Sequence, residues 1–228
     1  MGKCGIIEAE KILGSGKNKR IRNLVLYAFV KRVFDIIMGL VGLIVLVPLT
    51  IVIKMAYMCS GDFHPIFYAQ DRVGKDGKLF QIYKFRSMVW DAEEQLQKLL
   101  NYKKYKKQWK EFQKLDNDPR ITMVGRVIRR GSIDEIPQFL NVLFGQMSLI
   151  GPRPLVPGEL KEHKGDEKKY CSVKPGITGY WATRGRSDND YEDRLKMEYF
   201  YIENQCFSLD VKIFFRTIRT VIRSDGAK

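Results

Sequence analysis

One stretch of the chain limits its possible folds more than any other. Residues 36–53 read IIMGLVGLIVLVPLTIVI and contain no charged side chain. A helix that crosses a bilayer needs ~20 apolar residues, so this run predicts a membrane segment. It does not fit a secretory signal peptide, because a long basic leader precedes it and it lacks a small-residue cleavage site. The rest of the chain must therefore fold beside a membrane.

Pro48 lies late in this segment and leaves two topologies open. Proline removes a backbone hydrogen bond and bends a helix, so the segment is either a kinked spanning helix or a re-entrant helix that leaves on the side where it entered. Positive charges on both flanks favour the cytoplasmic side for each end. These are Arg20, Arg22, Lys31 and Arg32 before the segment and Lys54 after it. Asp35, at the start of the segment, predicts a cationic partner such as Arg32 or a lysine.

The balance of charges predicts anionic partners. The 228 residues suit one domain, and they include 40 Lys and Arg against 26 Asp and Glu, for a formal net charge of +14. Such an excess fits nucleic acid, an acidic membrane face or phosphorylated substrates. The four cysteines form no CxxC pair, so we expect reduced thiols. With only two histidines, His64 and His163, catalysis must depend mainly on carboxylates and cations.

The remaining pattern predicts an α+β protein that is mostly helical. Residues 65–89 alternate apolar and polar side chains around the turn GKDGK, which indicates a β-hairpin. A charged helix is expected at 90–115 and a short one at 133–144, whereas the loops GPRPLVPGE and KPGITGYW should be irregular. The expected inner face of the charged helix is Trp90, Leu96, Leu99, Leu100, Trp109 and Phe112. Its lysine run, NYKKYKKQWK, forms a solvated or lipid-headgroup face, or else contacts substrate.

The last helix is predicted to be basic and amphipathic. In SLDVKIFFRTIRTVIR, positive side chains recur at spacings of four, three and four, at Lys212, Arg216, Arg219 and Arg223. Apolar area comes from Leu209, Ile213, Phe214, Ile218, Val221 and Ile222. Such a helix suits an anionic membrane surface. The alternative is an ordinary surface helix packed on the core.

Two adjacent carboxylates, Asp134 and Glu135, raise the main chemical question. Ser132 and Glu135 match the S-x-x-E capping box, in which the serine caps a helix and the glutamate bonds back to it. Pro137 conflicts with a regular helix start, because its ring clashes with the carbonyl four residues earlier. The carboxylates are therefore expected at an irregular, partly open helix end.

The arginines around this acidic pair favour phosphate chemistry. Arg129 and Arg130 precede the pair, and Arg153 follows in GPRPL. Neighbouring cations lower the pKa of a carboxyl group and keep it ionised. An ionised aspartate can attack a phosphoryl group, an adjacent glutamate can bind Mg²⁺, and the planar guanidinium suits phosphate oxygens. Capping by one carboxylate and reaction by the other are compatible.

These segments, in order, resemble the bacterial sugar transferase family, the monotopic phosphoglycosyl transferases. The resemblance runs from about residue 31 to 222 and rests on KRVFD, the proline-containing apolar segment, QDRVGKDGKLFQIYKFRSM, NDPRITMVGRVIRRGSIDEIPQFLNVLFGQMSLIGPRPL, KPGITGYWATRGRSD, YEDRLKMEYFYIEN and SLDVKI. Each motif alone is weak. Their ordered combination is specific.

The resemblance implies a reaction and a location. Such enzymes move a sugar 1-phosphate from a UDP-sugar to undecaprenyl phosphate and release UMP, which initiates the assembly of exopolysaccharide, capsule, O-antigen or glycoprotein glycans. They sit on the cytoplasmic face of the inner membrane, among its phospholipids, through a re-entrant helix bent at the proline, here Pro48. It also implies the cofactor Mg²⁺, no nucleic-acid partner and a possible homodimer.

The resemblance also assigns roles to residues. Asp134 is expected to be the nucleophile that forms a covalent phosphosugar intermediate in a ping-pong scheme, and Glu135 is expected to help bind Mg²⁺. Substrate and phosphate binding are expected from Lys84, Arg129, Arg153, Arg186, Asp188 and Arg194. Glu198 departs from the family, which more often has aspartate there, and this puts a metal or substrate role in doubt. The stretch GRSD…YEDR favours a hexose such as galactose or glucose.

The expected organisation is a basic N-terminal extension over residues 1–30, a re-entrant helix-break-helix over 31–58 and a cytoplasmic catalytic domain over 59–228. Because some larger relatives have four additional transmembrane helices, the chain resembles the bare catalytic unit.

Two alternatives to the transferase function remain. One is a membrane-tethered basic module that binds anionic lipid or nucleic acid. The other is a polyprenyl-diphosphate hydrolase, which would release inorganic phosphate.

Overall fold

The computed structural model describes the backbone of residues 4–112, 115–162, 165–184 and 191–223, and the side chains of 24–109, 115–161, 165–184 and 191–220. Within these ranges the chain is mostly helical and contains two small two-stranded sheets, which confirms the α+β prediction. Cys59, Cys171 and Cys206 are free thiols, as expected. The division into domains stays a prediction.

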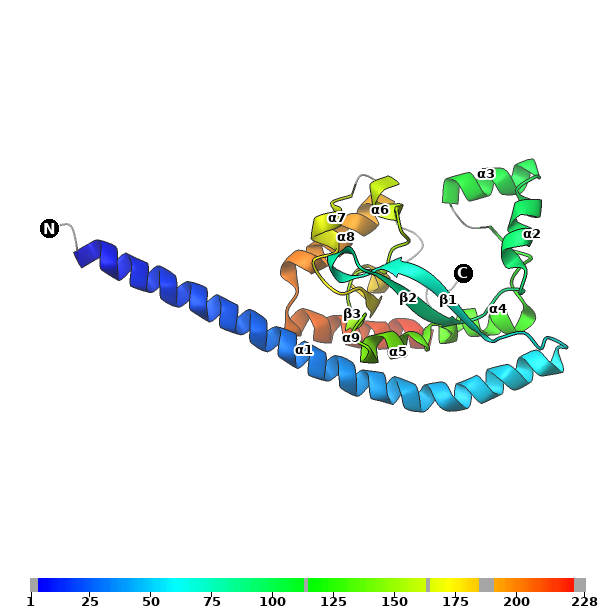
Figure 1. Ribbon diagram of the computed structural model, residues 1–228, viewed down its shortest axis with the longest axis horizontal. Helices are drawn as coiled ribbons and strands as arrows, with labels where there is room; N and C mark the ends of the chain where they lie inside the picture. The colour runs from blue at the N-terminus through cyan, green and yellow to red at the C-terminus, as the bar shows by residue number, and fades with distance from the viewer. Residues whose placement is uncertain (1–3, 113–114, 163–164, 185–190, 224–228) are drawn as a thin grey trace.

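The apolar segment belongs to one long helix. Helix α1 runs from Cys4 to Cys59 and continues through Pro48, so the predicted helix break there is wrong. The helix bows instead, with the rest of the described fold on its concave side (Figure 1). Thr50 Oγ1 donates to the carbonyl of Leu46 at 2.8 Å, a local bond that often accompanies helix bending. By length and composition, Leu24–Cys59 could cross a membrane. Its re-entrant topology stays a prediction.

A buried carboxylate fixes α1 to the centre of the fold. Asp35 is 3% exposed and accepts hydrogen bonds from Ser148 Oγ at 2.9 Å and from the Leu149 amide at 2.8 Å. Among the described residues, Asp35 forms no ion pair with Arg32 or a lysine, so the expectation of a cationic partner is wrong. Arg32 instead donates to the carbonyl of Val142 at 2.7 Å, at the end of another helix. A cation is favoured at that end by the unpaired carbonyls.

A second charged contact reaches the C-terminal helix. Lys31 Nζ lies 2.7 Å from Asp210 Oδ2, and both side chains are largely buried. Tyr27 donates to the same carboxylate at 2.9 Å and Tyr201 donates to its other oxygen at 2.8 Å. The carboxylate is thus paired and hydrogen-bonded, as a buried charge requires.

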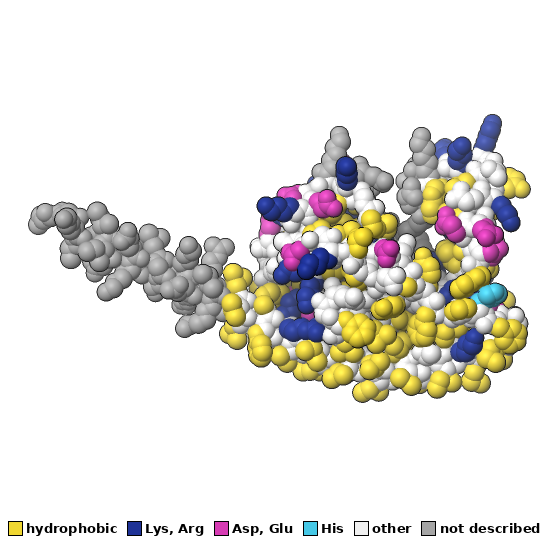
Figure 2. Space-filling view, viewed as in Figure 1, with side chains coloured by type: hydrophobic (Ala, Val, Ile, Leu, Met, Phe, Trp, Pro, Cys, Tyr) yellow, Lys and Arg dark blue, Asp and Glu magenta, His cyan; other side chains and the backbone are white. Residues whose placement is uncertain are grey.

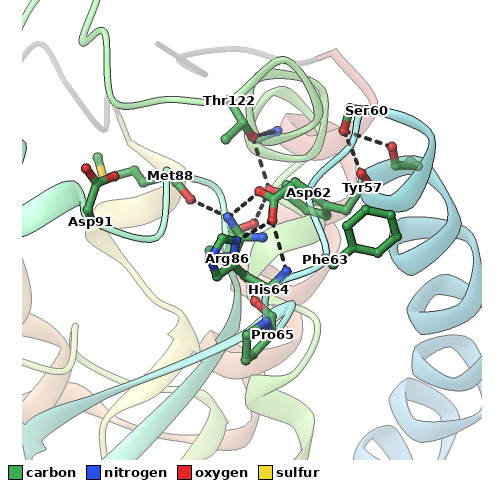
Figure 3. A network of polar contacts seen from close by, with 12 residues as sticks. Tyr57, Ser60, Asp62, Phe63, His64, Pro65, Arg86, Met88, Asp91 and Thr122 are labelled. Carbon is green, nitrogen blue, oxygen red and sulfur yellow. Dashed lines mark hydrogen bonds and ion pairs between the residues drawn. The ribbon is translucent and has the colours of Figure 1, made fainter.

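The far end of α1 is fastened by a polar network (Figure 3). Tyr57 donates to the Arg86 carbonyl at 2.6 Å and lies 3.1 Å from Thr122 Oγ1. The Arg86 guanidinium stacks on the Tyr57 ring at 4.5 Å and pairs with Asp62 at 2.9 Å. His64 also bonds to Asp62, at 2.9 Å. This network joins the end of the helix to the strands that follow.

The predicted hairpin is confirmed. Strand β1, Phe67–Val73, pairs antiparallel with β2, Leu79–Phe85, around a turn that contains the 3-10 helix η1, Lys75–Gly77. The side chains of Phe80 and Ile82 are buried between more exposed neighbours, as alternation along a half-buried strand requires. The hairpin extends from the end of α1 over helix α5, Gln138–Leu143 (Figure 1).

The charged segment forms two helices rather than one. Helix α2 spans Ala92–Leu99 and α3 spans Lys103–Phe112, so the single helix predicted at 90–115 is wrong. Asn101 lies in the interruption, and asparagine competes with helix hydrogen bonds through its side chain. Of the expected inner face, Leu96 is buried, but Trp90 is exposed. The lysine run on α3 lies across the hairpin from α1 (Figure 1), which favours a solvated face over contact with lipid headgroups.

The remaining elements are short until the chain reaches its last two helices. They are α4 (Met123–Arg130), η2 (Ile133–Glu135), α5 (Gln138–Leu143), β3 (Ser148–Ile150), α6 (Glu159–Glu162), α7 (Glu167–Tyr170), β4 (Gly176–Thr178), η3 (Trp181–Thr183), α8 (Tyr191–Asn204) and α9 (Phe207–Arg223). The helix predicted at 133–144 is divided at Pro137, which follows the 3-10 turn η2. The loop GPRPLVPGE, residues 151–159, is irregular as predicted until α6 begins, apart from an isolated bridge between Leu155 and Val73. The loop KPGITGYW, residues 174–181, instead contains β4, which pairs in parallel with β3.

Glycines allow the close approach at this parallel pair. A β-carbon on Gly176 would lie 2.1 Å from the amide nitrogen of Gly151, and one on Gly179 would lie 2.2 Å from the Gly151 carbonyl oxygen. Main-chain atoms cannot move aside as a flexible side chain can. The loop after β3 is therefore held directly against the segment that contains β4.

The C-terminal helix α9 packs on the core and also exposes apolar side chains. Ile213 is 1% exposed, whereas Phe215 and Ile218 are exposed beside Arg216 and Arg219. The predicted amphipathic helix is confirmed, and one face of it is a core contact. Hydrophobic side chains also cover the outer side of α1 (Figure 2), so a large apolar surface lies along this edge of the molecule. Such a surface marks a membrane or protein contact.

The packing of α1 on α5 depends on small residues, and this can be tested. A β-carbon on Gly42 would lie 2.2 Å from the base of the Phe139 ring. We expect Gly42→Leu to destabilise the fold by about 1–3 kcal/mol, because overpacking forces side chains and backbone apart. The measurement is the thermal unfolding midpoint in detergent. Val47→Leu, on the exposed side of the same helix, is the control. Equal midpoints for both variants would contradict this packing.

Candidate active site

The acidic pair lies in an irregular turn. Asp134 and Glu135 belong to η2, between α4 and α5. Ser132 precedes the turn with φ 53°, in the left-handed region, and its side chain makes no cap hydrogen bond. The predicted capping box is therefore wrong, and the alternative of a distorted helix start is confirmed. Because Glu135 is not used as a cap, both carboxylates are available for other contacts.

Strand β2 delivers a lysine to this turn. Lys84 Nζ lies 3.1 Å from Glu135 Oε1, and both side chains are partly exposed. The pair contributes little to stability in such a setting, so its interest is chemical. Asn141 fixes the strand to α5: it accepts from the Tyr83 amide at 3.1 Å and donates to the Gln81 carbonyl at 2.7 Å. The fully buried Asn141 therefore fixes the part of β2 that carries Lys84.

Burial controls the charge state of Asp134. Removal from water is the largest cause, and together with the negative charge of Glu135 it raises the pKa of the carboxyl group to about 6. Lys84 and Arg129 act in the opposite direction and only partly compensate. The expectation that neighbouring cations depress this pKa is wrong, because desolvation of the carboxylate outweighs them. With a pKa near 6, the group is still mainly ionised at neutral pH.

Arg129 is exposed at the end of α4 and acts on two carboxylates. Its charge lowers the pKa of Asp134 and also that of Asp118. Asp118 is paired with Arg120 at 2.7 Å. Arg129 is thus close enough to the acidic pair to interact with a substrate phosphate there.

The loop that carries Arg153 is fixed through its backbone. The Arg153 amide donates to Glu198 Oε1 at 3.1 Å, and its carbonyl accepts from Tyr170 at 3.0 Å. Its guanidinium is exposed. Glu198 is 1% exposed, and this burial raises the pKa of its carboxyl group to about 7 against the opposing charges of Arg194 and Arg153. Glu198 therefore positions the arginine loop from beneath and does not face solvent.

Arg194 is buried behind this loop. Its guanidinium lies 3.0 Å from Glu159 Oε1 and stacks over the rings of Tyr191 at 4.7 Å and Trp181 at 5.3 Å. Glu159 in turn accepts from the Val156 amide at 3.0 Å. These contacts suit a residue that supports the arginine loop. Direct phosphate binding by Arg194 stays a prediction.

The structure thus brings together five predicted residues, four of them at one turn and the fifth on a nearby loop. Asp134, Glu135, Lys84 and Arg129 meet at η2, whereas Arg153 enters from the loop after β3. Arg186 and Asp188 lie outside the described residues. Two residues were missed by sequence reasoning, Asn141 and Arg72. The alternation along β1 could have indicated Arg72, which shares a strand face with the residue opposite Lys84.

The acidic pair fits a magnesium ion only in part. Among the described residues, no three or more Asp, Glu, His or Cys side chains gather as a metal site. Mg²⁺ commonly binds through one or two carboxylates and completes its coordination with water and substrate phosphates. Asp134 and Glu135 supply that number of carboxylates, and Lys84 already contacts one of them. The residues therefore suit an ion that arrives with a phosphorylated substrate.

Comparison with known proteins agrees with this chemistry. The family model described as bacterial sugar transferase matches residues 26–224. The chain is 46% identical over 200 residues to the undecaprenyl-phosphate galactose phosphotransferase of Salmonella typhimurium, which covers 87% of this chain and 42% of that protein. It is 38% identical over 199 residues to the exopolysaccharide production protein ExoY of Sinorhizobium fredii, which covers 86% of this chain and 87% of that protein. The chain thus spans less than half of the first relative and most of the second.

The buried acid predicts a pH-dependent stability. The pKa of Glu198 rises from 4.5 to about 7 on folding, so the unfolded chain loses this proton first as pH increases. The folded state is therefore destabilised progressively between these values, by about 3 kcal/mol at most. Glu198→Gln keeps an acceptor for the Arg153 amide and removes the charge.

We expect Glu198→Gln to unfold at a higher temperature than the wild type at pH 8 and at nearly the same temperature at pH 4. Thermal unfolding across this range is the measurement. The exposed Glu192 on the same helix provides the control, Glu192→Gln, which should show no such trend. A wild type that is more stable than Glu198→Gln at pH 8 would contradict the assigned role of burial.

Proposed function

Because this chain belongs to the bacterial sugar transferase family, we propose that it transfers a sugar 1-phosphate from a UDP-sugar to undecaprenyl phosphate and releases UMP. The observation that carries the proposal is the position of a mostly ionised, partly desolvated Asp134 beside Glu135, Lys84 and Arg129. Both substrates are anions, and fixed cations offset their repulsion. The product would initiate the assembly of a lipid-linked glycan.

Asp134 acts as the nucleophile in this proposal. One of its carboxylate oxygens forms a bond to the β-phosphorus of the donor, and the bond from that phosphorus to the bridging oxygen breaks. The electron pair stays on the bridging oxygen, which leaves as part of UMP. An oxygen of undecaprenyl phosphate then attacks the phosphosugar on Asp134 and restores the free carboxylate. Two transfers at one nucleophile allow the two anions to use the site in turn.

The other residues bind and orient the phosphates. Lys84 and Arg129 act at the acidic pair, and Arg153 acts from its loop, which Glu198 holds in place. Mg²⁺ bound with Glu135 would supply further positive charge to stabilise the phosphoryl group during its transfer. Arg186 and Asp188, by the resemblance, would add contacts to the donor. The names of the relatives favour galactose as the sugar.

The membrane location completes the proposal. The acceptor is a lipid, so the site must lie near a bilayer surface, and the apolar outer side of α1 provides the contact (Figure 2). Basic residues flank the apolar run at both ends, which favours a monotopic, re-entrant arrangement on the cytoplasmic face of the inner membrane. The bow of α1 is compatible with this arrangement (Figure 1).

The nucleophile can be tested with a single substitution. We expect Asp134→Asn to reduce UMP release by roughly 10³-fold or more, because no covalent intermediate can form. The assay combines detergent-purified protein, Mg²⁺, undecaprenyl phosphate and a panel of UDP-sugars. Asp71→Asn, an exposed aspartate of β1, is the matched control. Undiminished UMP release by Asp134→Asn would refute the assignment, and release of inorganic phosphate without a UDP-sugar would favour a hydrolase.

The raised pKa of Asp134 predicts a pH profile. The nucleophile must be ionised, so its reactive fraction falls about tenfold for each pH unit below the pKa. We expect the rate of the donor half-reaction to level off above pH 7 and to decline below about pH 6, near the pKa of this group. Intact mass spectrometry of the phosphosugar adduct, with UDP-sugar and no acceptor, measures that rate. A rate that stays constant down to pH 4.5 would contradict an ionised Asp134 as the attacking group.

A further inference from the structure

Arg72 is a half-buried arginine that the mechanism above does not use. It lies one residue before the end of β1. Its Nη2 donates to Gln70 Oε1 at 2.6 Å, and its Nη1 lies 3.5 Å from the carbonyl oxygen of Pro154. The buried Nε has no hydrogen-bond partner among the described residues. The side chain therefore reaches the loop that carries Arg153 and retains capacity to donate.

The strand register places Arg72 on the face of the hairpin that holds Lys84. Lys84 is paired with Tyr68, and Tyr68, Gln70 and Arg72 alternate with residues that point to the other face. Four residues along a strand correspond to about 13 Å. The hairpin thus presents two cations at separate positions on one face, Lys84 at the acidic pair and Arg72 toward the turn.

The charges around Arg72 favour an anion at this position. Burial lowers the pKa of its guanidinium first, and the nearby positive charge of Arg153 lowers it further. Glu159 and Glu135 only partly offset this, and Glu159 is already paired with Arg194. The guanidinium of Arg153 makes no hydrogen bond to the described side chains. Two repelling arginines with unused donors are stabilised when a phosphate binds both, and their planar forks match its oxygens.

The position along the hairpin distinguishes the two phosphorylated substrates. The end of β2 near Lys84 is joined to α1 through the contact between Tyr57 and Arg86. The opposite end, with Arg72, rises away from α1 toward the turn (Figure 1). The turn is held there by the Asp76 amide, which donates to the Cys171 carbonyl at 2.7 Å. A lipid phosphate approaches from the side of α1, whereas a nucleotide approaches from water.

We infer that Arg72 and Arg153 form a second phosphate subsite, which binds the phosphate that leaves with the nucleotide. This inference rests on the proposed function. When Asp134 bonds to the β-phosphorus, the bridging oxygen takes the electron pair and negative charge grows on the departing nucleoside monophosphate. Arg72 lies where it can stabilise that charge, while Lys84 and Arg129 stay with the transferred phosphoryl group. Because the lipid phosphate approaches from the side of α1, Arg72 serves the donor half-reaction and contributes little to the acceptor half-reaction.

The test separates the two half-reactions. The wild type is compared with Arg72→Gln, with Arg72→Lys and with a control, Lys78→Gln. The control removes one charge from the exposed turn of the same hairpin. The donor half-reaction is the formation of the phosphosugar adduct from a UDP-sugar without acceptor. The acceptor half-reaction is the discharge of the isolated adduct by undecaprenyl phosphate. Thermal unfolding of each variant reports damage to the fold.

We expect Arg72→Gln to lower kcat/KM of the donor half-reaction by about 10- to 100-fold, the loss of one charge-assisted contact. Arg72→Lys should recover part of it, and the acceptor half-reaction should change less than twofold. A loss confined to the acceptor step would overturn the inference in favour of the lipid phosphate. If Arg72→Gln lowers the rates of both half-reactions equally and Arg72→Lys does not restore them, Arg72 has only a structural role. The same conclusion follows if neither rate falls.

The activity of the wild type distinguishes failure of the subsite inference from failure of the proposed function. If the wild type forms no adduct and releases no UMP with any donor, the transferase proposal fails and the subsite fails with it. If it is active and depends on Asp134 while Arg72→Gln behaves like Lys78→Gln, only the subsite is refuted. Binding of UMP, measured by calorimetry, gives an independent readout, and Arg72→Gln should weaken it by a similar factor.

Discussion

The fold depends on a charged clamp at the start of its apolar helix. Lys31 pairs with Asp210 on α9, and Asp35 accepts hydrogen bonds at the start of β3, so one turn of α1 is fixed to both the last helix and a central strand. Breaking such a buried pair leaves an uncompensated charge, which costs far more than the pair contributes. The clamp therefore fixes register: the apolar helix can occupy one position against the core, and the acidic pair stays at a defined depth relative to it.

The chemistry depends on an opposite use of buried charge. Asp134 is only partly compensated, since Lys84 and Arg129 do not cancel its desolvation. A carboxylate in this state is a better nucleophile than one held in a full ion pair, because fewer hydrogen bonds must be given up when it attacks. Glu198 shows the same principle in a supporting role, where a buried acid fixes the backbone of the arginine loop. The structural carboxylate of Asp210 is paired with Lys31, whereas Asp134 forms no ion pair with the described residues.

Local sequence patterns correctly predicted those elements whose formation depends on neighbouring residues in the chain. The hairpin and α9 follow from alternation and from helical periodicity, and Asp134 and Glu135 follow from motif order. The capping box was misread because Ser132 adopts a left-handed conformation that its own sequence does not favour. Arg72 and Asn141 escaped notice because their importance depends on which face of β1 and which side of α5 turn toward the acidic pair. That information belongs to tertiary packing, and a spacing rule does not contain it.

The three glycines beneath the arginine loop limit how this enzyme can diversify. Gly151, Gly176 and Gly179 bring main chain against main chain, so a substitution at any of them collides with atoms that have nowhere to go. A selection for new sugar donors would therefore find no productive variants at these positions, however close they lie to the substrate. The backbone at these glycines cannot accept side chains, so differences in donor specificity must arise from substitutions in other segments near the site, where a larger side chain can be accommodated.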